Sequence, residues 1–497
     1  MKEKIYSTLK HSTIYGIGNV ALKGMGVITL PIFVKFLSLA QYGAFGILDV
    51  TIGILSEVLT LGQSNSVILF NNSGDYKEKK KTVFFTITMS LLLFNLTFIV
   101  ASELFGAPFL RSIKTSNEFI SFLPFIIYIS CTRMLNNIFM NKLRADDKSL
   151  LFTVITIIKI LVFLALVYIM VIHLKLALAG ILYSYLISEI SILIIQFPFM
   201  VTEMEVKFDK EILRQALKFG FPLLFSTIGI MILNLSDRYM IKFFLNLKAV
   251  GLYDFGYRIA GVIYMFLILP FNQAFLPAAY KAYNQPDDKR YYTKAMTYMC
   301  FITIWGGLAL SLFSNWIILL MGNKNYLDAQ SFIPVIILAY IFSGKRNIAS
   351  TGLLLAGKTS YIAYITMGAG IINILLNLWL IPLYGIIAAA YTTLFSFVVF
   401  YLITKFLADK FFPIPYEGMK ILRLFFLGIA LYLLAFLIPF ENIMVTFALK
   451  MMLVLSFPFI LVPLNFYEKI ELEILTKILK NPFSIKKIVF NIFKNDD

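Results

Sequence analysis

The sequence predicts an all-α polytopic membrane protein with about 14 transmembrane helices. Of its 497 residues, 60% are hydrophobic and only 14% are charged, whereas soluble domains carry about 25% charged residues. The hydrophobic residues also form long runs, and about 20 apolar residues in a helix span the hydrocarbon core of a bilayer. Because the runs are continuous and do not alternate every second residue, we expect helices and not a β-barrel.

Fourteen hydrophobic runs follow one another along the chain. The first is longer than the ~7 to 15-residue apolar core of a signal peptide, so we expect it to remain as a helix. Cys131 and Cys300 both lie inside runs, and the sequence therefore predicts neither a disulfide framework nor a metal site. The runs cover residues 12–37, 42–70, 83–110, 119–141, 150–172, 177–200, 217–242, 250–278, 294–321, 331–356, 361–382, 386–409, 420–439 and 446–466.

The placement of Lys and Arg predicts the orientation of these helices. When the N-terminus is set on the inner side, most of the 44 basic residues fall in inner segments and few fall in outer loops. By the positive-inside rule, both termini are then cytoplasmic. The net charge of +17 is explained by this topology and by contact with anionic lipid, and it does not indicate a nucleic-acid partner.

An internal repeat divides the chain into two six-helix lobes. Residues 37–45 match residues 245–253 in pattern, and each stretch joins the first helix of a half to its second. Gly43 and Gly251 take the same place in the two copies, where each allows a tight turn or close packing. A weaker echo relates Arg133 to the Lys345 region. Since six helices separate the copies, both halves face the same way, as in transporters whose lobes rock about a central site.

These boundaries give the expected organisation of the chain. Two C-terminal helices follow the lobes, and the tail is expected to lie on the inner membrane surface as a basic amphipathic helix. The parts are an N-lobe over residues 1–200, a cytoplasmic linker over 201–216, a C-lobe over 217–409, two further helices over 410–466 and the tail over 467–497.

Several short motifs carry a resemblance to a known family. Together they resemble the Wzx-type flippases, polysaccharide biosynthesis proteins of the multidrug/oligosaccharidyl-lipid/polysaccharide (MOP) exporter superfamily, over essentially all fourteen runs. The motifs are Phe219-Gly220-Phe221-Pro222-Leu223, Ser236-Asp237-Arg238-Tyr239, Val250-Gly251-Leu252-Tyr253, Leu39-Ala40-Gln41-Tyr42-Gly43, Leu143-Arg144-Ala145, Ala356-Gly357-Lys358-Thr359, Asn373-Ile374-Leu375-Leu376-Asn377 and Ile381-Pro382-Leu383-Tyr384-Gly385.

The resemblance implies a MATE-like fold and a transport function without a cofactor. The implied substrate is an undecaprenyl-diphosphate-linked oligosaccharide, which moves from the inner to the outer leaflet of a bacterial cytoplasmic membrane. The implied product is a surface polysaccharide such as O-antigen (lipopolysaccharide) or capsule. The implied partners are this lipid-linked oligosaccharide, membrane lipids and other polysaccharide-assembly proteins.

Basic residues deep in the runs agree with a diphosphate substrate. Lipid cannot solvate the negative charge of a diphosphate, so a carrier would supply Arg and Lys as partners. Lys159 is expected to pair with Glu189 on the next run. The residues expected to bind the diphosphate or glycan are Lys23, Arg133, Arg238, Arg258, Lys345 and Arg346.

Each of these cations also has a structural alternative. Arg258 can pair with Asp254 one helical turn earlier, and Asp237 and Arg238 can pair with each other or snorkel to the membrane surface. Lys345 and Arg346 are adjacent on a helix, so their side chains point about 100° apart. One of them can then face the lumen while the other faces the lobe interior.

Coupling to an ion gradient needs a site that binds H⁺ or Na⁺ better in one state than in the other. A buried carboxylate serves for H⁺, and the sequence offers Glu57, Asp49 and Asp237 in this role. A salt bridge between Glu57 and Lys23 is an equally good interpretation. The chain contains no Gly-x-x-x-x-Gly-Lys-Ser/Thr signature, so direct ATP hydrolysis is not expected.

Three other functions are weighed against this one. A lipid II flippase for peptidoglycan would share the fourteen helices and a cationic cavity, and the composition does not separate it. A multidrug exporter of the same superfamily would favour an acidic lumen for cationic substrates, whereas here deep cations outnumber deep anions. A membrane-embedded polysaccharide polymerase or ligase would need a catalytic loop, yet the predicted outer loops are short. An enzyme is therefore not expected.

Overall fold

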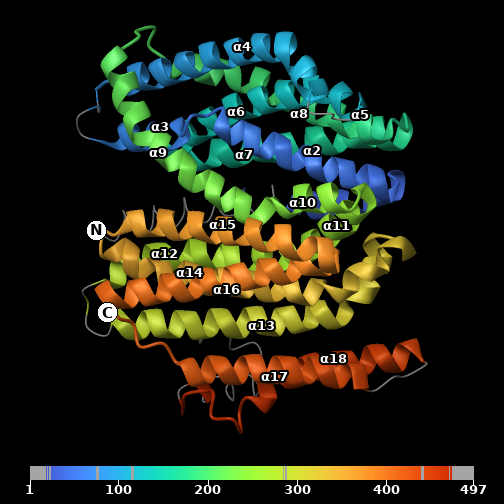
Figure 1. Cartoon of the computed structure of the whole chain (residues 1–497). Coiled ribbons are helices and arrows are strands. Elements are labelled where there is room, and N and C mark those ends of the chain that lie inside the picture. The colour runs from blue at the N-terminus through green and yellow to red at the C-terminus, as the bar shows by residue number, and fades with distance from the viewer. Residues whose placement is uncertain are drawn as a thin grey trace.

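The computed structural model describes residues 18, 21, 24–73, 76, 78–112, 117–283, 285, 288–437, 442–469 and 471–472. Within these ranges every regular element is helical (Figure 1). After a first described helix over Gly24–Phe36, the elements are α2 (Leu39–Val58), α3 (Gln63–Asn72), α4 (Lys80–Ser112), α5 (Asn117–Ser121), α6 (Leu123–Ala145), α7 (Ser149–Val167), η2 (Tyr168–His173), α8 (Ala177–Thr202), α9 (Lys210–Leu235), α10 (Asp237–Phe244), α11 (Leu247–Ile263), η3 (Tyr264–Ile268), α12 (Leu269–Ala282), α13 (Asp288–Met321), η4 (Lys324–Ser331), α14 (Ile333–Leu355), α15 (Thr359–Tyr384), α16 (Ile386–Phe411), α17 (Gly418–Leu437) and α18 (Ile443–Ile460).

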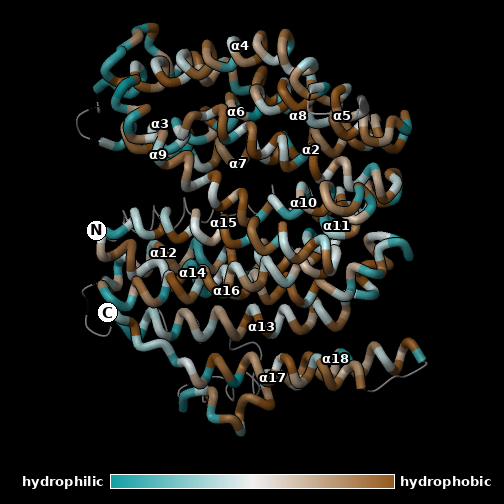
Figure 2. Tube along the Cα trace, viewed as in Figure 1, coloured by the Kyte–Doolittle hydropathy of each residue, from teal (hydrophilic) through white to brown (hydrophobic). Residues whose placement is uncertain are grey.

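Helices occupy all fourteen predicted runs. In the part of the chain that the structure describes, twelve helical stretches are long and apolar enough to cross a membrane, and the pair η4 and α14, bent by 52°, makes a thirteenth. Gly24–Phe36 is the described part of the first run. Figure 2 shows apolar residues along the length of α4, α13, α17 and α18. The predicted fold is confirmed, and the chain is a multi-pass membrane protein.

The helices form two lobes and a C-terminal pair. In the N-lobe, at the top of Figure 1, α6 packs against α2, α3, α4 and α8. In the C-lobe below it, α14 packs against α11, α13 and α16. α17 and α18 pack against α13 on the side of the C-lobe away from the N-lobe. The central helices of each lobe therefore bury their side chains, while the C-terminal pair stays largely exposed to lipid.

One helix, α9, contacts both lobes. Its first half packs against α3 and α4, where the Ser66 hydroxyl donates a hydrogen bond of 2.8 Å to the Ala216 carbonyl. Its second half packs against α15, where Gly229 approaches Met367. Figure 1 shows α9 running from the N-lobe down to α10. Motion between the lobes would therefore involve α9 as well as the contact between α2 and α11.

Three predicted run boundaries are corrected by the structure. The run over 42–70 is broken between α2 and α3, because Leu61 and Gly62 take positive φ angles of 49° and 73°. Gly62 also faces the Gly220 carbonyl, which would lie 2.0 Å from an added Cβ, so only glycine fits there. The run over 217–242 starts earlier, at Lys210, and α18 ends at Ile460. Nearly all of the predicted tail helix lies outside the described residues.

Candidate functional site

The two repeats meet at a glycine contact between α2 and α11. An added Cβ at Gly43 would lie 1.9 Å from the Leu247 carbonyl oxygen, and one at Gly251 would lie 2.3 Å from the Leu39 carbonyl oxygen. Atoms in proteins do not approach so closely, so both positions require glycine. Of the two uses the sequence allowed for these glycines, the structure shows close packing. We call this contact the glycine crossing.

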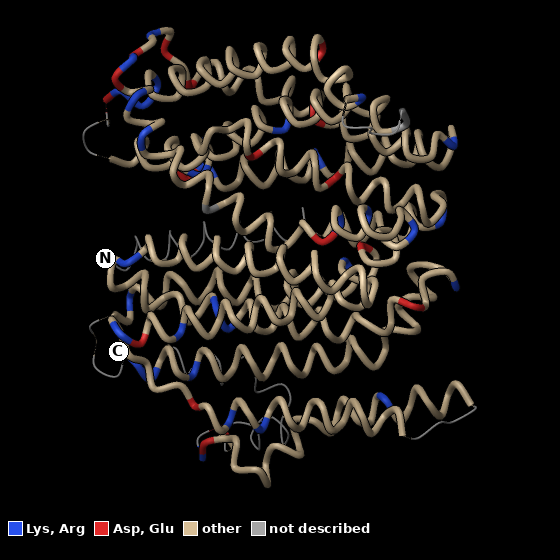
Figure 3. Tube along the Cα trace, in the orientation of Figure 1, with Lys and Arg blue, Asp and Glu red and all other residues tan. Residues whose placement is uncertain are grey.

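Beside the glycine crossing, a chain of charges joins the lobes. The Arg258 guanidinium donates to Asp49 of the N-lobe at 2.9 Å and to Asp254 at 2.6 Å. Asp254 also accepts a hydrogen bond from Arg238 at 3.1 Å and one from the Tyr42 hydroxyl at 3.3 Å. The alternative that Arg258 pairs with Asp254 is thus confirmed, and the same arginine links the lobes. Figure 3 shows charged residues gathered near α10 and α11.

Asp237 and Arg238 are adjacent in sequence but have different partners. Both side chains are buried, so neither snorkels to the membrane surface. Arg238 pairs with Asp254 and not with Asp237. The Asp237 carboxylate accepts three hydrogen bonds, all from uncharged groups: the Tyr253 hydroxyl at 2.5 Å, the Asn377 amide at 2.7 Å and the Thr393 hydroxyl at 2.9 Å. These donors come from α11, α15 and α16.

In the centre of the N-lobe, two cations share one carboxylate. Glu189 of α8, fully buried, accepts hydrogen bonds from Arg133 of α6 at 2.9 Å and from Lys159 of α7 at 2.7 Å. The Asn136 amide adds a third at 2.8 Å. The predicted Lys159–Glu189 salt bridge is confirmed. Because the two cations share a single counter-ion, this cluster keeps one net positive charge.

The N-lobe cluster borders an open space. Arg133, Lys159 and Glu189 line a cavity of about 200 Å³, together with Asp49 and Met25. The Arg133 and Lys159 side chains keep 19% and 23% of their surface exposed, whereas Glu189 keeps 1%. The two cations therefore present more of their surface than the carboxylate does.

Lys345 and Arg346 point to different surroundings, as adjacent residues of a helix must. The Lys345 ammonium lies inside the C-lobe among the rings of Phe342, Tyr401 and Phe425, at 4.7, 4.3 and 5.3 Å from their centroids. The structure therefore places Lys345 away from the space between the lobes.

Arg346 lies on the other side of α14, near Tyr264 and 4.3 Å above the ring of Phe400. Its guanidinium donates to the Asn347 amide oxygen at 2.8 Å, while its buried Nε has no partner. Among the described residues it has no carboxylate in contact. Arg346 is thus a cation with unused hydrogen-bonding capacity.

Three predicted site residues, Lys23, Glu57 and Asp49, come from the first part of the chain. Lys23 lies outside the described residues, so neither its role nor its pairing with Glu57 is tested. Glu57 of α2 is partly buried and makes no side-chain hydrogen bond or ion pair with the described residues. Asp49, the other predicted carboxylate of α2, is held by Arg258.

A second cavity lies between the first helix and the C-lobe. It measures about 240 Å³ and is lined by Gly26, Tyr257, Arg258, Tyr264 and Tyr340, among others. The two cavities are neighbours, because Asp49, which lines the first, forms an ion pair with Arg258, which lines the second. We call this pair of cavities the lumen.

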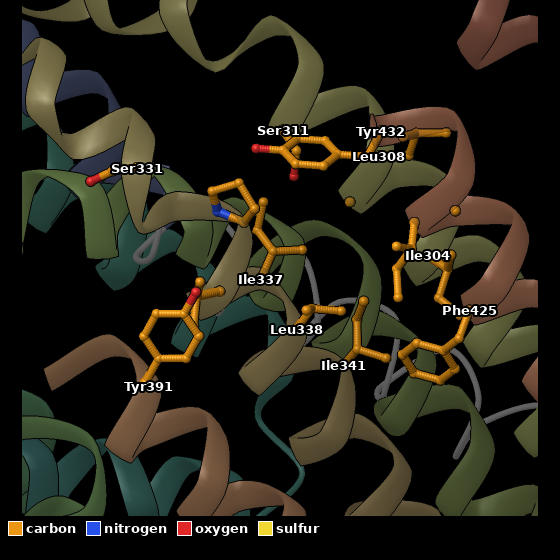
Figure 4. A pocket seen from close by; sticks show the side chains of 15 residues that line it. Ile304, Leu308, Ser311, Ser331, Ile337, Leu338, Ile341, Tyr391, Phe425 and Tyr432 are labelled. Carbon is orange, nitrogen blue, oxygen red and sulfur yellow. The ribbon is translucent and has the colours of Figure 1, made fainter. Parts of the chain in front are cut away.

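A larger cleft, of about 350 Å³, lies between α17 and the C-lobe. Figure 4 shows its lining, which is apolar apart from the hydroxyls of Ser311, Ser331, Tyr391 and Tyr432. No charged residue lines it. This cleft suits hydrocarbon and is unsuited to a diphosphate.

Sequence reasoning missed several polar residues of these sites. It did not assign Asp254 as the acid shared by two arginines, nor Asn377, Thr393 and Tyr253 as partners of Asp237. A signal was present: Asn373 and Asn377 are spaced by four on a transmembrane run, which puts two amides on one face. The lumen tyrosines carried no such signal, because isolated tyrosines are common in membrane helices.

Comparison with known proteins places the chain in a family. A family model described as polysaccharide biosynthesis protein matches residues 8–282. The chain belongs to this family. A second model, described as MatE, matches residues 222–379. An uncharacterized membrane protein of Methanocaldococcus jannaschii is 22% identical over 265 residues. That match spans about half of this chain and half of the relative's length.

Solved structures share the fold at low sequence identity. The structure of the lipid II flippase MurJ in an inward closed conformation superposes with a TM-score of 0.72 at 15% identity, covering 90% of this chain and 98% of that one. An inward-facing multidrug resistance MATE family transporter of the MOP superfamily gives a TM-score of 0.64 at 15% identity, covering 80% and 98%. Family and fold together describe a multi-pass membrane protein of the polysaccharide biosynthesis family that shares its fold with these transporters.

Proposed function

We propose that this polysaccharide biosynthesis family member flips a diphosphate-linked oligosaccharide lipid across a bacterial cytoplasmic membrane. The observation that carries the proposal is Arg346, an arginine near Tyr264 of the lumen, with no carboxylate in contact among the described residues and with an unpaired Nε. An arginine left in this condition in a membrane protein is costly unless an anionic ligand completes its hydrogen bonds. A phosphate group has the charge and geometry to do so.

Charge accounting supports the same ligand. In the N-lobe, Arg133 and Lys159 share Glu189 and leave one net positive charge at the cavity. In the C-lobe, Arg238 and Arg258 have Asp254 and Asp49 as partners, so they offer less unbalanced charge to a ligand. Apart from Lys345, which packs among rings inside the C-lobe, the unbalanced positive charge of these described residues therefore lies on the Arg133 cluster and on Arg346. A diphosphate held between them would draw the lobes together.

The expected orientation completes the proposal. The loops rich in Lys and Arg face the cytoplasm, with both termini on that side, and the oligosaccharide leaves from the opposite leaflet. Glycan-assembly proteins of the membrane supply the substrate and consume it. The hydrocarbon tail remains in lipid and can use apolar clefts such as the one beside α17.

We further propose that Asp237 couples transport to H⁺ or Na⁺. Its carboxylate is fully buried and, among the described residues, is hydrogen-bonded only by uncharged groups and has no counter-ion in direct contact. A proton or a small cation would neutralise it. Asp49 is less suited, since Arg258 already holds it. The Asn373 amide beside this cluster has an unpaired Nδ2, which leaves room for rearrangement when the ion binds.

The test uses purified protein in proteoliposomes that contain undecaprenyl diphosphate carrying a fluorescent oligosaccharide. Flipping is read as loss of fluorescence to a membrane-impermeant quencher. We expect Arg346→Ala to slow flipping by about 10- to 100-fold, as loss of a charge-assisted hydrogen bond predicts, with Arg346→Lys in between. The matched control is Arg423→Ala, because Arg423 of α17 donates to the Leu464 carbonyl and lies outside the lumen.

The outcomes separate the candidate functions. Wild-type protein that does not flip the lipid, or Arg346→Ala that flips at the wild-type rate, contradicts the proposal. Preferential flipping of lipid II would favour the peptidoglycan alternative, and transport of a cationic dye would favour a multidrug exporter. For coupling, Asp237→Asn is expected to make flipping insensitive to Na⁺ and to a pH gradient. Unchanged ion dependence in that variant would exclude Asp237 from the role.

A further inference from the structure

The C-lobe half of the lumen is built largely from tyrosines. The rings of Tyr257 and Tyr340 lie 5.5 Å apart at an interplanar angle of 67°, and those of Tyr264 and Tyr340 lie 5.6 Å apart at 39°. Tyr264 and Tyr340 are only partly buried, so both present surface to the cavity of about 240 Å³. Three phenol groups on neighbouring helices are unusual in a membrane interior, where aliphatic side chains would pack at lower cost.

Two glycines keep this cavity open. An added Cβ at Gly261 would meet the Tyr340 hydroxyl at 3.5 Å, and one at Gly26 would meet the Arg258 guanidinium at 3.9 Å. Neither position is as crowded as the glycine crossing, so a small side chain would fit without strain. Its atoms would, however, take up the space beside the tyrosines. The cavity is thus open because Gly26 and Gly261 have no side chains to fill it. At about 240 Å³ it has room for a sugar ring as well as for water.

The charges around the cavity exclude some ligands and favour others. Arg258 lines it directly, and Arg346 lies near Tyr264, one of its lining residues. No acidic residue is among those lining it. A cationic ligand would find no counter-ion there. A ring with hydroxyl groups and a nearby phosphate would find aromatic faces, phenol hydroxyls and an arginine.

We propose that this tyrosine cavity binds the sugar ring adjacent to the diphosphate. The C–H groups of a pyranose carry slight positive charge and lie well against the negative face of an aromatic ring. The ring hydroxyls can exchange hydrogen bonds with the phenols. With the diphosphate at Arg346, the first sugar reaches Tyr264 and Tyr340. This inference rests on the proposed function and adds a glycan subsite to it.

The experiment compares two lipids on purified protein in nanodiscs. One probe is undecaprenyl diphosphate without sugar, and the other is undecaprenyl diphosphate carrying N-acetylglucosamine; affinities are measured by thermophoresis. We expect Tyr264→Leu to weaken binding of the sugar-bearing lipid by about 3- to 10-fold, the range for loss of one aromatic contact. Binding of the bare lipid should not change. Tyr264→Phe keeps the ring face and should retain most of the affinity.

Further variants test whether the space itself matters. Gly261→Leu fills the cavity and is expected to reduce affinity for the sugar-bearing lipid selectively. The control for Tyr264→Leu is Tyr361→Leu, the same substitution at the start of α15, where Tyr361 packs against Phe411 and lines neither the lumen nor the cleft beside α17. It should leave both affinities unchanged. Thermal unfolding of each variant shows whether it remains folded.

The possible results distinguish failure of the sugar subsite from failure of the proposed function. If wild-type protein binds both lipids but Tyr264→Leu and Gly261→Leu weaken them equally or not at all, the sugar subsite is overturned and the proposed function stands. If wild-type protein binds neither lipid, the proposed function fails and the subsite fails with it. A selective loss for the sugar-bearing lipid supports both.

Discussion

Glu189 offers the sharpest test of how the lumen charges are held. It is the only described carboxylate in contact with Arg133 and Lys159, so replacing it with glutamine keeps the side-chain shape and removes the counter-charge. Two cations then remain together inside the N-lobe. We expect Glu189→Gln to destabilise this lobe strongly.

The magnitude follows from burial and geometry. Removing one partner of a buried ion pair costs about 3–5 kcal/mol. Arg133 and Lys159 are 19% and 23% exposed, so water reaches them and the lower end applies, about 3 kcal/mol. For a lobe of roughly 200 residues this corresponds to a fall in Tm of roughly 6–12 °C. Adding Lys159→Met to Glu189→Gln removes one of the two cations and should recover part of the lost Tm, because the effects of mutations at contacting residues are not additive.

Thermal unfolding of purified protein, followed by intrinsic fluorescence, measures both effects. The control is Glu211→Gln, because Glu211 is 63% exposed and its contact with Arg214 is 4.0 Å long. An exposed pair of this kind contributes about 0–1 kcal/mol. An unchanged Tm in Glu189→Gln would refute the reasoning. The reasoning would also be refuted if the fall in Tm of the double variant, Glu189→Gln with Lys159→Met, equalled the sum of the falls in the two single variants.

Three further predictions concern other parts of the molecule. Gly43→Leu should force the lobes apart at the glycine crossing, because even a Cβ at residue 43 would lie 1.9 Å from a carbonyl oxygen. Distances measured between spin labels on the two lobes should then increase. Gly53→Leu on the same helix meets nothing within 4 Å, and an equal change there would contradict the crossing. At Glu417 burial raises the pKa, but hydrogen bonds from two lysines and a threonine outweigh it and hold the pKa below its usual value. Because the pKa is lower in the folded state, Glu417 stabilises the fold above the unfolded value of 4.5, and this stability is lost as the pH falls through the folded-state pKa. Hydrogen exchange of the α17 amides should therefore speed up in acid. In Glu417→Gln, which has no titrating carboxyl, it should not. Lys345→Met should preserve flipping and thermal stability, and lost flipping in a folded variant would place Lys345 in the substrate path.

Much of the fold could be predicted because hydrophobic runs are local. Each run is long enough to require a helix whatever it packs against. The repeat was also readable, since Gly43 and Gly251 stand at matching places. One pairing, Lys159 with Glu189, could be predicted because the two residues lie at similar depth on consecutive helices. The break at Gly62 could not, because it depends on contact with Gly220, far away in sequence.

The partners of the deep charges depended on distant helices. Arg258 finds Asp49 across 209 residues, and Asp237 finds Thr393 across 156. Nothing in the local sequence states which of several carboxylates an arginine reaches. The same holds for Lys345 and Arg346, whose helix position fixes their divergence but not which of them faces the lumen.

The sequence by itself determined a bundle of membrane helices, its two-fold repeat and an excess of buried cations. Those properties follow from hydropathy, length and residue identity, which act along the chain. Only the tertiary structure decided which of these cations have a carboxylate partner among the described residues and which do not. That depends on which carboxylates the packed helices bring within about 3 Å, and charge at membrane depth is neutralised by whatever lies closest in space. The packed helices pair Arg238 and Arg258 with Asp254 and Asp49, whereas Arg346 has no carboxylate in contact among the described residues.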